Sequence, residues 1–256
     1  LVIAIGYHIR KIFPYTIFAR RDIKHTENPA TISILSSNVL KDNTNYQALR
    51  DTVLRLEPDL LLLIEYTPQW QANSQWLHEH YSHNVECPYE NGFGFALFSK
   101  HEFVADQLRF LVCEDIPSMH TQITLSGGQK IRMIGVHPTP PVPWAEGTAW
   151  DKDQETMSLA ELVNEEGTPT IVAGDFNDTS WSIVMQRFKK ESGLLDPRIG
   201  RGFFNTFHAD HPLISYPIDH IFVSNHFQLN DFRRIKIEGT DHFALFATLH
   251  LVDEKG

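Results

Sequence analysis

The sequence has little cysteine, no long apolar run and no excess of positive charge. Only Cys87 and Cys113 occur in 256 residues, too few for a disulfide scaffold or a zinc site built from several thiolates. The two thiols either pair as one disulfide or remain as two buried thiols. No apolar stretch approaches the ~20 residues that a membrane span needs. A disulfide-rich module and a membrane-embedded chain are therefore excluded for this sequence.

The charge balance is acidic, with 22 Lys and Arg against 32 Asp and Glu and a formal net charge of −10. Proteins that bind nucleic acid by neutralising phosphates usually carry a basic face. The basic clusters here are short: Arg20 and Arg21, Lys189 and Lys190, and Arg233, Arg234 and Lys236. The balance weakens a nucleic-acid-binding function without excluding it, and acidic side chains also gather around metal ions.

Residues 1–30 differ from the rest of the chain. An apolar start, Leu1 to Ile5, is followed by basic and aromatic side chains through Phe18. One interpretation is an arm that lies on the domain. The other is a stem that follows membrane helices upstream of residue 1, since aromatic and basic side chains suit the headgroup interface. The ordinary hydrophobic and charged fractions, 42% and 21%, predict one folded domain over residues 31–252.

Short apolar runs rich in Ile, Val and Phe predict buried strands. They cover residues 31–35, 60–64, 93–98, 131–136, 170–173, 218–223 and 243–251. Helical spacing of apolar residues occurs over 46–56, 156–163 and 181–188, the last helix expected to contain Trp181 and to be capped by Asp178 to Ser180. Strands and helices alternate too irregularly for a barrel of eight βα units, which predicts mixed sheets with helices outside. The stretches around residues 90–130 and 202–251 are expected to be hairpin-rich sheet with few helices. Residues 101–120, 138–150 and 200–216 are expected to be loops that select the substrate.

Polar side chains follow the predicted strands at the points where the strands end. They are Asn38, Glu65, His137, Asp175, Asn177, Asp219, Asp241 and His242. Taken singly, each is an ordinary turn, cap or structural residue. Strand ends on one edge of a sheet lie close together, however, so the set is expected to converge on one cleft.

Hydrolysis of a phosphate ester needs this mixture of side chains. The reaction requires a cation, a base for water, and donors for the charge that builds on the phosphate oxygens. Glu65 is suited to bind Mg²⁺, which prefers oxygen ligands, and amides such as Asn38 and Asn177 can contact phosphate, water or metal. A pair such as Asp219 and His242 fixes the imidazole tautomer and makes the ring a better base.

The sequence resembles the endonuclease/exonuclease/phosphatase superfamily, whose fold is deoxyribonuclease I-like. Seven motifs carry the resemblance, in the family's order, over nearly all of residues 31–251. They are SSNVL (36–40), PDLLLLIE (58–65), GFALFSK (94–100), GVHPTPP (135–141), GDFND (174–178), PIDHIFVS (217–224) and TDH (240–242). The HPTPP form is most similar to bacterial members, some of which carry the domain behind N-terminal membrane helices.

The resemblance implies a four-layer α/β sandwich of two packed mixed β-sheets with helices outside, and a Mg²⁺- or Mn²⁺-dependent hydrolase of phosphoesters in nucleic acid, lipid or small molecules. It also implies roles for the eight side chains: Glu65, Asn38 and Asp241 at the metal, His137, Asn177 and Asn38 at the phosphate, and Asp175 and His242, the latter oriented by Asp219, as acid and base. Which of Asp175 and His242 is the base stays open.

One departure and two alternatives accompany the resemblance. Some nuclease members have a second acidic residue shortly after the first Asn, where this chain has Val39, Leu40 and Lys41, so a second metal position is doubtful. A binding or scaffold protein that keeps the fold without the chemistry is one alternative. A zinc hydrolase is another, although no HExxH spacing occurs. We expect a monomer, on the extracytoplasmic side of a bacterial inner membrane if the stem interpretation holds and in the cytoplasm otherwise.

Overall fold

A computed structural model describes residues 2–141, 148–164, 167–211 and 213–252. Its helices are α1 (Val2–Ile12), the 3₁₀ helix η1 (Phe13–Tyr15), α2 (Tyr46–Leu56), α3 (Pro68–Asn73), α4 (Leu77–His80), α5 (Thr148–Asn164) and α6 (Ile183–Ser192). Its strands are β1 (Ile32–Asn38), β2 (Leu60–Ile64), β3 (His83–Cys87), β4 (Phe95–Ser99), β5 (Glu102–Arg109), β6 (Ser118–Thr124), β7 (Lys130–Val136), β8 (Thr170–Asp175), β9 (Asp219–Val223), β10 (Phe227–Lys236) and β11 (Phe243–Leu251).

The strands form two sheets. Sheet A has the order β10-β11-β1-β2-β4-β3, and sheet B has the order β5-β6-β7-β8-β9. Each contains one parallel pair, β1 with β2 and β7 with β8, among antiparallel neighbours. In both parallel pairs the carboxyl ends lie at one edge, which places Asn38 beside Ile64 and Val136 beside Gly174. The prediction of two mixed sheets is confirmed.

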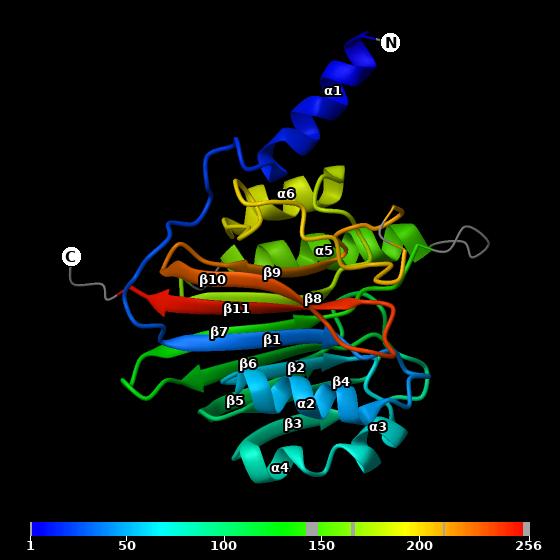
Figure 1. Cartoon of the computed structure of the whole chain (residues 1–256), viewed down its shortest axis with the longest axis vertical. Coiled ribbons are helices and arrows are strands. Elements are labelled where there is room, and N and C mark those ends of the chain that lie inside the picture. Colours follow the sequence, from blue (N-terminus) through cyan, green and yellow to red (C-terminus); the bar gives the residue numbers. More distant parts are fainter. Residues whose placement is uncertain (1, 142–147, 165–166, 212, 253–256) are drawn as a thin grey trace.

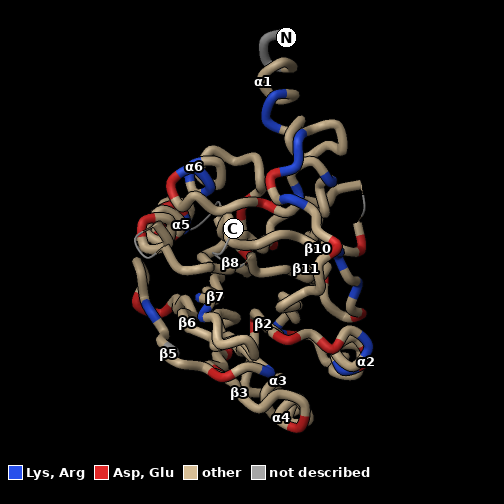
Figure 2. The backbone as a smooth tube through the Cα atoms, turned by 90° about the vertical axis from the view of Figure 1, so that its left-hand side faces the viewer, with Lys and Arg blue, Asp and Glu red and all other residues tan. Residues whose placement is uncertain are grey.

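Three hydrophobic cores separate four layers. The largest core lies between the sheets and contains side chains such as Leu62, Met133 and Leu245. A second core joins sheet A to α2, α3 and α4, and a third joins sheet B to α5 and α6. Figure 1 shows the strands of the two sheets between the helices. Figure 2 shows α5 and α6 on one outer side of the sheets and α2 on the other. The predicted four-layer α/β sandwich is therefore confirmed.

The seven predicted strands are present within a few residues of their expected limits, and β5, β6 and β10 confirm the hairpin-rich sheet predicted around residues 90–130 and 202–251. Four strands were not placed individually from the sequence. They are β3, β5, β6 and β10, and three of these lie at sheet edges. Edge strands are partly exposed, so polar residues interrupt the apolar run that identifies a buried strand. The prediction of a loop over residues 101–120 is wrong for this reason, since β5 and the start of β6 lie within it.

Two smaller expectations are also corrected. Both cysteines are free and half-buried, so they form neither the disulfide nor a pair of fully buried thiols. Helix α6 begins after Trp181, and its cap is Ser182, whose hydroxyl accepts a hydrogen bond from the backbone nitrogen of Met185 at 3.0 Å. Asp178 instead accepts a hydrogen bond from the Ser182 hydroxyl at 2.9 Å and one from Lys152 at 2.5 Å. Six residues of the predicted loop 138–150, residues 142–147, lie outside the described residues.

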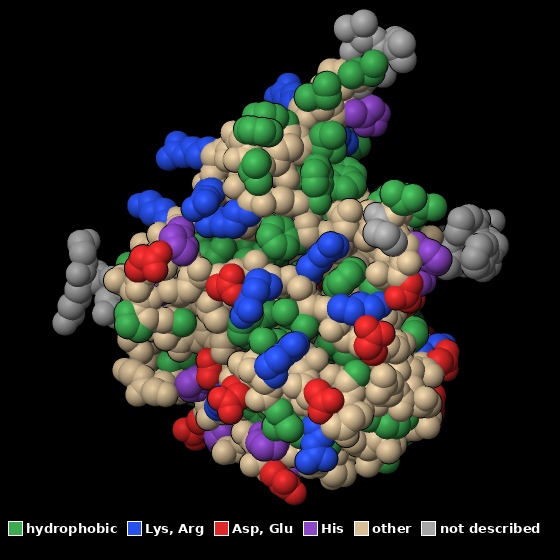
Figure 3. Space-filling model, viewed as in Figure 1, with side chains coloured by type: hydrophobic (Ala, Val, Ile, Leu, Met, Phe, Trp, Pro, Cys, Tyr) green, Lys and Arg blue, Asp and Glu red, His purple; other side chains and the backbone are tan. Residues whose placement is uncertain are grey.

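Helix α1 projects from the body, whereas the segment after it lies on the domain (Figure 1). Tyr15 is buried, and its hydroxyl donates to the Ser180 carbonyl at 2.8 Å. Hydrophobic side chains lie exposed along the projecting end (Figure 3), and Figure 2 shows Lys and Arg gathered there. The exposed residues include Ile5, Tyr7, Ile9, Phe13, Ile17 and Phe18. Among the described residues no helix is both long and apolar enough to cross a membrane. The membrane-proximal stem stays a prediction.

Glu155 on α5 is a buried carboxyl outside the predicted site. Its side chain is 2% exposed, and neither carboxyl oxygen has a hydrogen-bond partner among the described residues. Burial raises the pKa of Glu155 from 4.5 to about 7, because the charged form loses its hydration. The folded protein therefore holds this proton over a pH range in which the unfolded chain releases it.

The stability of the protein is expected to fall as pH rises from 4.5 to 7, because the unfolded chain binds fewer protons there. Glu155→Gln removes this titration. Its stability advantage over the wild type is expected to grow by roughly 2–3 kcal/mol between pH 5 and pH 8. Urea unfolding of both proteins at the two pH values measures the difference. Glu161→Gln, an exposed position on the same helix, is the control. An advantage that does not change with pH would contradict the expectation.

Candidate functional site

A pocket of about 390 Å³ opens where the strand ends of the two sheets meet. It is lined by Lys41, Glu65, Asn91, Gly92, Phe93, His137, Pro140, Asp175, Asn177, Phe207, Ile218, Asp241 and His242. Six of the eight predicted side chains are in this set, and the other two lie directly behind it. Each sheet supplies half of the predicted residues: Asn38, Glu65, Asp241 and His242 adjoin strands of sheet A, and His137, Asp175, Asn177 and Asp219 adjoin strands of sheet B.

Asn38 connects the two sheets. Its Nδ2 donates to Glu65 Oε1 at 2.9 Å and to Asp175 Oδ2 at 3.2 Å. Its Oδ1 accepts from the backbone nitrogen of Leu40 at 3.0 Å, and the Lys41 backbone nitrogen donates to Glu65 Oε2 at 2.9 Å. In this arrangement Asn38 presents an N–H group to the carboxylates. The contacts suit a hydrogen-bond donor that fixes both carboxylates, and its predicted role as a metal ligand stays a prediction.

The Asp175 carboxylate is the centre of the site. Besides Asn38, the Nε2 atoms of His137 and His242 lie 4.0 and 3.8 Å from its Oδ2. The backbone nitrogen of Asn177 donates to its Oδ1 at 2.8 Å. Burial raises the pKa of Asp175 to about 7, and the charge of Asp219 adds to the increase. The positive charge of His242 and the hydrogen bonds from the Asn177 backbone and the Asn38 side chain lower the pKa of Asp175, but they do not cancel the increase.

His242 is held by Asp219. Its Nδ1 lies 2.8 Å from Asp219 Oδ2, while its Nε2 faces the pocket, 3.9 Å from Asp241 Oδ1. Burial by itself would lower the pKa of His242, but Asp219, Asp175 and Asp241 together raise it to about 10. The ring is therefore protonated, with Nδ1–H donated to Asp219 and Nε2–H directed to the pocket.

Gly174, which precedes Asp175, is required by the close approach of β7 and β8. It has φ +150°, and a Cβ at this position would lie 1.9 Å from the Val136 carbonyl oxygen. No side chain fits there, so the glycine of the GDFND motif allows His137 and Asp175 to follow adjacent strands at this short separation.

Two site residues have left-handed backbone conformations that residues other than glycine rarely adopt. Glu65 has φ 61° and Asn177 has φ 51°. Such conformations cost about 1–3 kcal/mol each and tend to occur at functional sites. The Asn177 Nδ2 donates to the Pro138 carbonyl at 2.9 Å, which ties the loop after β8 to the loop after His137. His137 packs against the Phe93 ring at 5.4 Å, and burial lowers the pKa of His137, so its ring is neutral.

The oxygen atoms in the pocket suit a hard divalent cation. Asp241 Oδ1 is buried and has no hydrogen-bond partner among the described residues, and the Glu65 carboxylate lines the same pocket. Carboxylate oxygens are the ligands that Mg²⁺ and Mn²⁺ prefer. Asp175, Asp219 and His242 also lie close enough together to hold an ion. We favour the first set, because His242 Nδ1 and Asp219 Oδ2 already bind each other.

Several residues of the site were not found from the sequence. Phe93 and Phe207 line the pocket beside the two histidines, and the Phe207 ring lies 5.0 Å from that of His242. Thr240 donates its hydroxyl to the Asn38 carbonyl at 2.9 Å, and Thr206 accepts from the Asp219 backbone nitrogen at 3.1 Å. Thr240 lies in the TDH motif and could have been found. Phe207 and Thr206 belong to a segment without periodicity, so no local signal marks them.

A buried ion pair lies behind Asp219. Arg198 and Asp196 are both fully buried and form two hydrogen bonds, Nε to Oδ1 at 2.9 Å and Nη2 to Oδ2 at 3.0 Å. Arg198 Nη1 also donates to the Asp219 carbonyl at 3.3 Å, and Nη2 contacts His220 Nδ1. The Nε2 of His220 lies 2.9 Å from the carbonyl oxygen of Asp178. One guanidinium thus connects the segment that bears Asp219 to the loop after Asp175.

The chain was compared with models of known protein families. The model of the Endonuclease/Exonuclease/phosphatase family matches residues 35–242. Among curated protein sequences none matches.

Solved structures resemble the chain at low identity. Humanized TDP2 of D. rerio matches with TM-score 0.67 and 18% identity, covering 86% of this chain and 98% of that chain. A mannosyl-6-phosphatase of Bacteroides thetaiotaomicron has TM-score 0.65 and 16% identity, covering 86% and 100%. The human Nocturnin catalytic domain with bound sulfate has TM-score 0.65 and 16% identity, covering 91% and 96%. At these identities the likeness establishes a shared fold.

Proposed function

This chain belongs to the endonuclease/exonuclease/phosphatase family, and on that premise we propose that it hydrolyses phosphoester bonds with the help of one Mg²⁺ or Mn²⁺ ion. One observation carries the proposal. The Asp175 carboxylate lies between Asn38, His137 and His242 in a pocket that also contains Glu65 and Asp241. Acid, base and cation-binding groups are thus within reach of one bound phosphate.

Asp175 and His242 each act in one of the proton transfers of the reaction. Asp175, fixed through Oδ1 by the Asn177 backbone, presents Oδ2 to the centre of the site and orients or deprotonates the attacking water. His242 directs Nε2–H into the pocket and supplies the other acid–base group. Asp219 holds the ring by Nδ1, which keeps the reacting nitrogen aimed at the pocket.

His137 and Asn177 provide polar contacts for the phosphate from the sheet B side of the pocket. Donors placed in advance around a reacting phosphate stabilise the charge that develops on its oxygens. Glu65 and Asp241 would hold the cation, with Asn38 fixing the Glu65 carboxylate. When bound, the cation would supply charge neutralisation for the phosphate oxygens and polarise them.

Within phosphoesters, we propose a small substrate in preference to a polymer. Among the described residues that line the pocket, Lys41 is the only Lys or Arg. A nucleic acid strand would present several phosphates, and its binding usually needs several cations. The walls contain Phe93, Pro140, Phe207 and Ile218, which suit an apolar or ring-shaped group attached to one phosphate. A nuclease remains the competing activity within the same chemistry.

Removal of divalent metal is expected to abolish hydrolysis. The test is a panel of bis-nitrophenyl phosphate, nitrophenyl phosphate, inositol phosphates, sphingomyelin, plasmid DNA and RNA, each with Mg²⁺, with Mn²⁺ and with EDTA. We expect turnover of small esters in either metal, loss of activity in EDTA and recovery when the metal is restored. Activity unchanged by EDTA would refute the role of the cation, and faster cleavage of DNA than of every small ester would refute the small-substrate proposal.

A further inference from the structure

Lys41 lines the candidate site and has a free ammonium group. It lies shortly after β1 and is exposed, and its side chain forms no hydrogen bond or ion pair with any of the described residues. The protonated ring of His242, a second cation in the pocket, is already bound through Nδ1 to Asp219. An ammonium group that lines a binding pocket and has no carboxylate of its own can bind an anionic group of the ligand.

The loop after β1 fixes the backbone of Lys41. Leu40, directly before it, has φ 59°, and its carbonyl accepts from the indole nitrogen of the buried Trp70 at 3.2 Å. The backbone nitrogen of Lys41 donates to Glu65 Oε2 at 2.9 Å. Asn43 is also buried, and its backbone nitrogen donates to the Leu40 carbonyl at 2.9 Å. The backbone is therefore held, while the flexible four-carbon stem of the lysine can adapt to a ligand.

The side chain of Lys41 leads from the carboxylate proposed to bind the cation to the groups proposed to contact the phosphate. Its backbone contacts Glu65, whereas a Cβ added to Gly92 would lie only 3.5 Å from its Cδ. Gly92 precedes Phe93, whose ring centroid lies 5.4 Å from that of His137. All five residues line the pocket. The ammonium group, two bonds beyond Cδ, is therefore within reach of a phosphate bound between Glu65 and His137.

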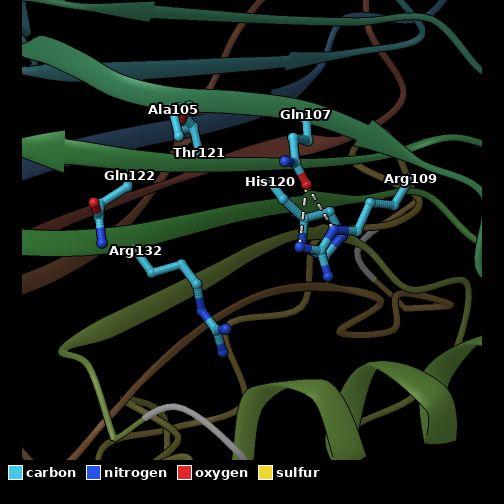
Figure 4. Close-up of a pocket in the computed structure, with 7 residues that line it drawn as sticks. All are labelled: Ala105, Gln107, Arg109, His120, Thr121, Gln122 and Arg132. Carbon is cyan, nitrogen blue, oxygen red and sulfur yellow. Dashed lines mark hydrogen bonds between the residues drawn. The ribbon is translucent and has the colours of Figure 1, made fainter.

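The arginines of a second pocket, on the outer face of sheet B, provide a contrast (Figure 4). Arg109 donates from Nε and Nη2 to Gln107 Oε1 at 3.3 and 3.2 Å. Arg132 donates from Nη2 to two backbone carbonyls of α5 at 3.3 and 3.2 Å. These contacts tie both guanidinium groups to the fold, whereas the ammonium group of Lys41 has no such contact in the part of the chain that the structure describes.

The charge of the substrate determines whether such a lysine has a partner. A phosphate monoester carries a charge of about −1.5 to −2 near neutral pH and has three terminal oxygens. A diester carries one negative charge and has two terminal oxygens, because its third oxygen bears a second substituent. The cation, together with His137 and Asn177, would serve the two oxygens that both kinds of ester possess. A monoester has one more charged oxygen, which needs a positive partner.

We propose that Lys41 binds this third terminal oxygen, which makes phosphate monoesters the preferred substrates of the site. The inference rests on the proposed function, because it concerns the same pocket, and it narrows the substrate to one class. Lys41 is then a specificity residue. Its contact exists in the bound substrate as well as in the transition state, so it acts mainly on KM.

Lys41→Met keeps the length of the side chain and removes its charge. We expect it to lower kcat/KM for nitrophenyl phosphate by about tenfold, mainly through a higher KM, and to change kcat/KM for bis-nitrophenyl phosphate by less than about twofold. Lys41→Arg keeps the charge and is expected to recover most of the loss. Lys130→Met, at an exposed position where β7 begins, is the matched control and is expected to have wild-type kinetics with both esters.

Binding of phenylphosphonate tests the contact without turnover. At mildly alkaline pH this compound is a dianion with three terminal oxygens and has no ester bond to cleave, while its methyl ester is a monoanion with two. Calorimetric titration in Mg²⁺ is expected to show about tenfold weaker binding of phenylphosphonate to Lys41→Met than to the wild type. The affinity for the methyl ester is expected to change by less than about twofold.

The two measurements separate the failure of this inference from the failure of the proposed function. Equal losses for the monoanionic and the dianionic compound, or no loss for either, would overturn the role of Lys41 and leave the proposed hydrolysis intact. A loss of DNA cleavage as large as the loss with nitrophenyl phosphate would also overturn it, since the lysine would then bind a diester. No turnover by the wild type, with the expected phosphonate result, would refute the hydrolysis and support the contact.

Discussion

Replacement of Asp175 by Asn is expected to lower kcat/KM for bis-nitrophenyl phosphate by about 10²–10⁴-fold, with the fold intact. Asn is nearly isosteric and keeps an oxygen for the Asn177 backbone nitrogen. It cannot take a proton, and its amide places an N–H opposite the Asn38 Nδ2 where a carboxylate oxygen now accepts. The measurement is steady-state hydrolysis in Mg²⁺, with urea unfolding to show that the protein is folded.

A double variant sharpens this expectation. If Asp175 and His242 act in the same step, Asp175→Asn combined with His242→Gln loses little more activity than either change alone, because residues that act as a unit are not additive. Asp51→Asn, an exposed carboxyl on α2 that accepts from Gln47, is the matched control and is expected to keep wild-type activity. Wild-type rates in both single variants would refute the assignment of the site.

Breaking the buried ion pair behind Asp219 has the largest expected effect on stability. Asp196→Asn is expected to lower the free energy of unfolding by about 3–5 kcal/mol, because it leaves the fully buried guanidinium of Arg198 without its counter-charge. The same change is expected to lower kcat more than it raises KM. Arg198 donates to the Asp219 carbonyl, so its displacement alters how Asp219 holds His242. Urea unfolding and steady-state kinetics measure the two effects.

An exposed ion pair provides the comparison. Arg187 and Glu191 are four residues apart on α6, and Glu191→Gln is expected to cost less than about 0.5 kcal/mol. Arg198→Lys keeps the charge but cannot make the two-point contact with Asp196, so we expect it to recover part of the stability and little of the activity. Wild-type kinetics in a folded Arg198→Lys protein would show that the pair is structural and does not position Asp219.

The sequence predicts the parts of this structure that depend on local patterns. Continuous apolar runs such as those of β2 and β8 identify strands buried on both faces, and the polar residues that end them identify one edge of each sheet. Half-exposed strands such as β5 lack that pattern. The sequence indicated hairpin-rich sheet in that stretch without placing its strands, and residues 101–120 were also expected to be a loop. The state of Cys87 and Cys113 could not be predicted either, because the number of cysteines does not show how far apart they lie in the fold.

The residues missed at the site act through tertiary contacts. Phe93 and Phe207 border the pocket from segments that are far apart in sequence. Phe93 directly precedes the GFALFSK motif, but nothing in the sequence indicates that its ring borders the pocket, and Phe207 has no motif beside it. Arg198 interacts with Asp219, more than twenty residues away, through a carbonyl that every residue possesses. Such contacts have no signature in a single sequence. Glu65 and Asn177 were found as polar groups, but their left-handed backbone, which aims the side chains, was not.

The order of strands in sheet A has a consequence for the synthesis of the chain. β11, the last strand among the described residues, lies between β10 and β1, and β1 ends at Asn38. Five backbone partners join β1 to β11 across about two hundred residues, which makes this pairing one of the most non-local in the molecule. A nascent chain that ends at residue 242 would contain all eight predicted side chains but no strand to join β10 to β1. The pocket is therefore assembled only after the final strand has emerged from the ribosome, and no shorter intermediate of translation contains it.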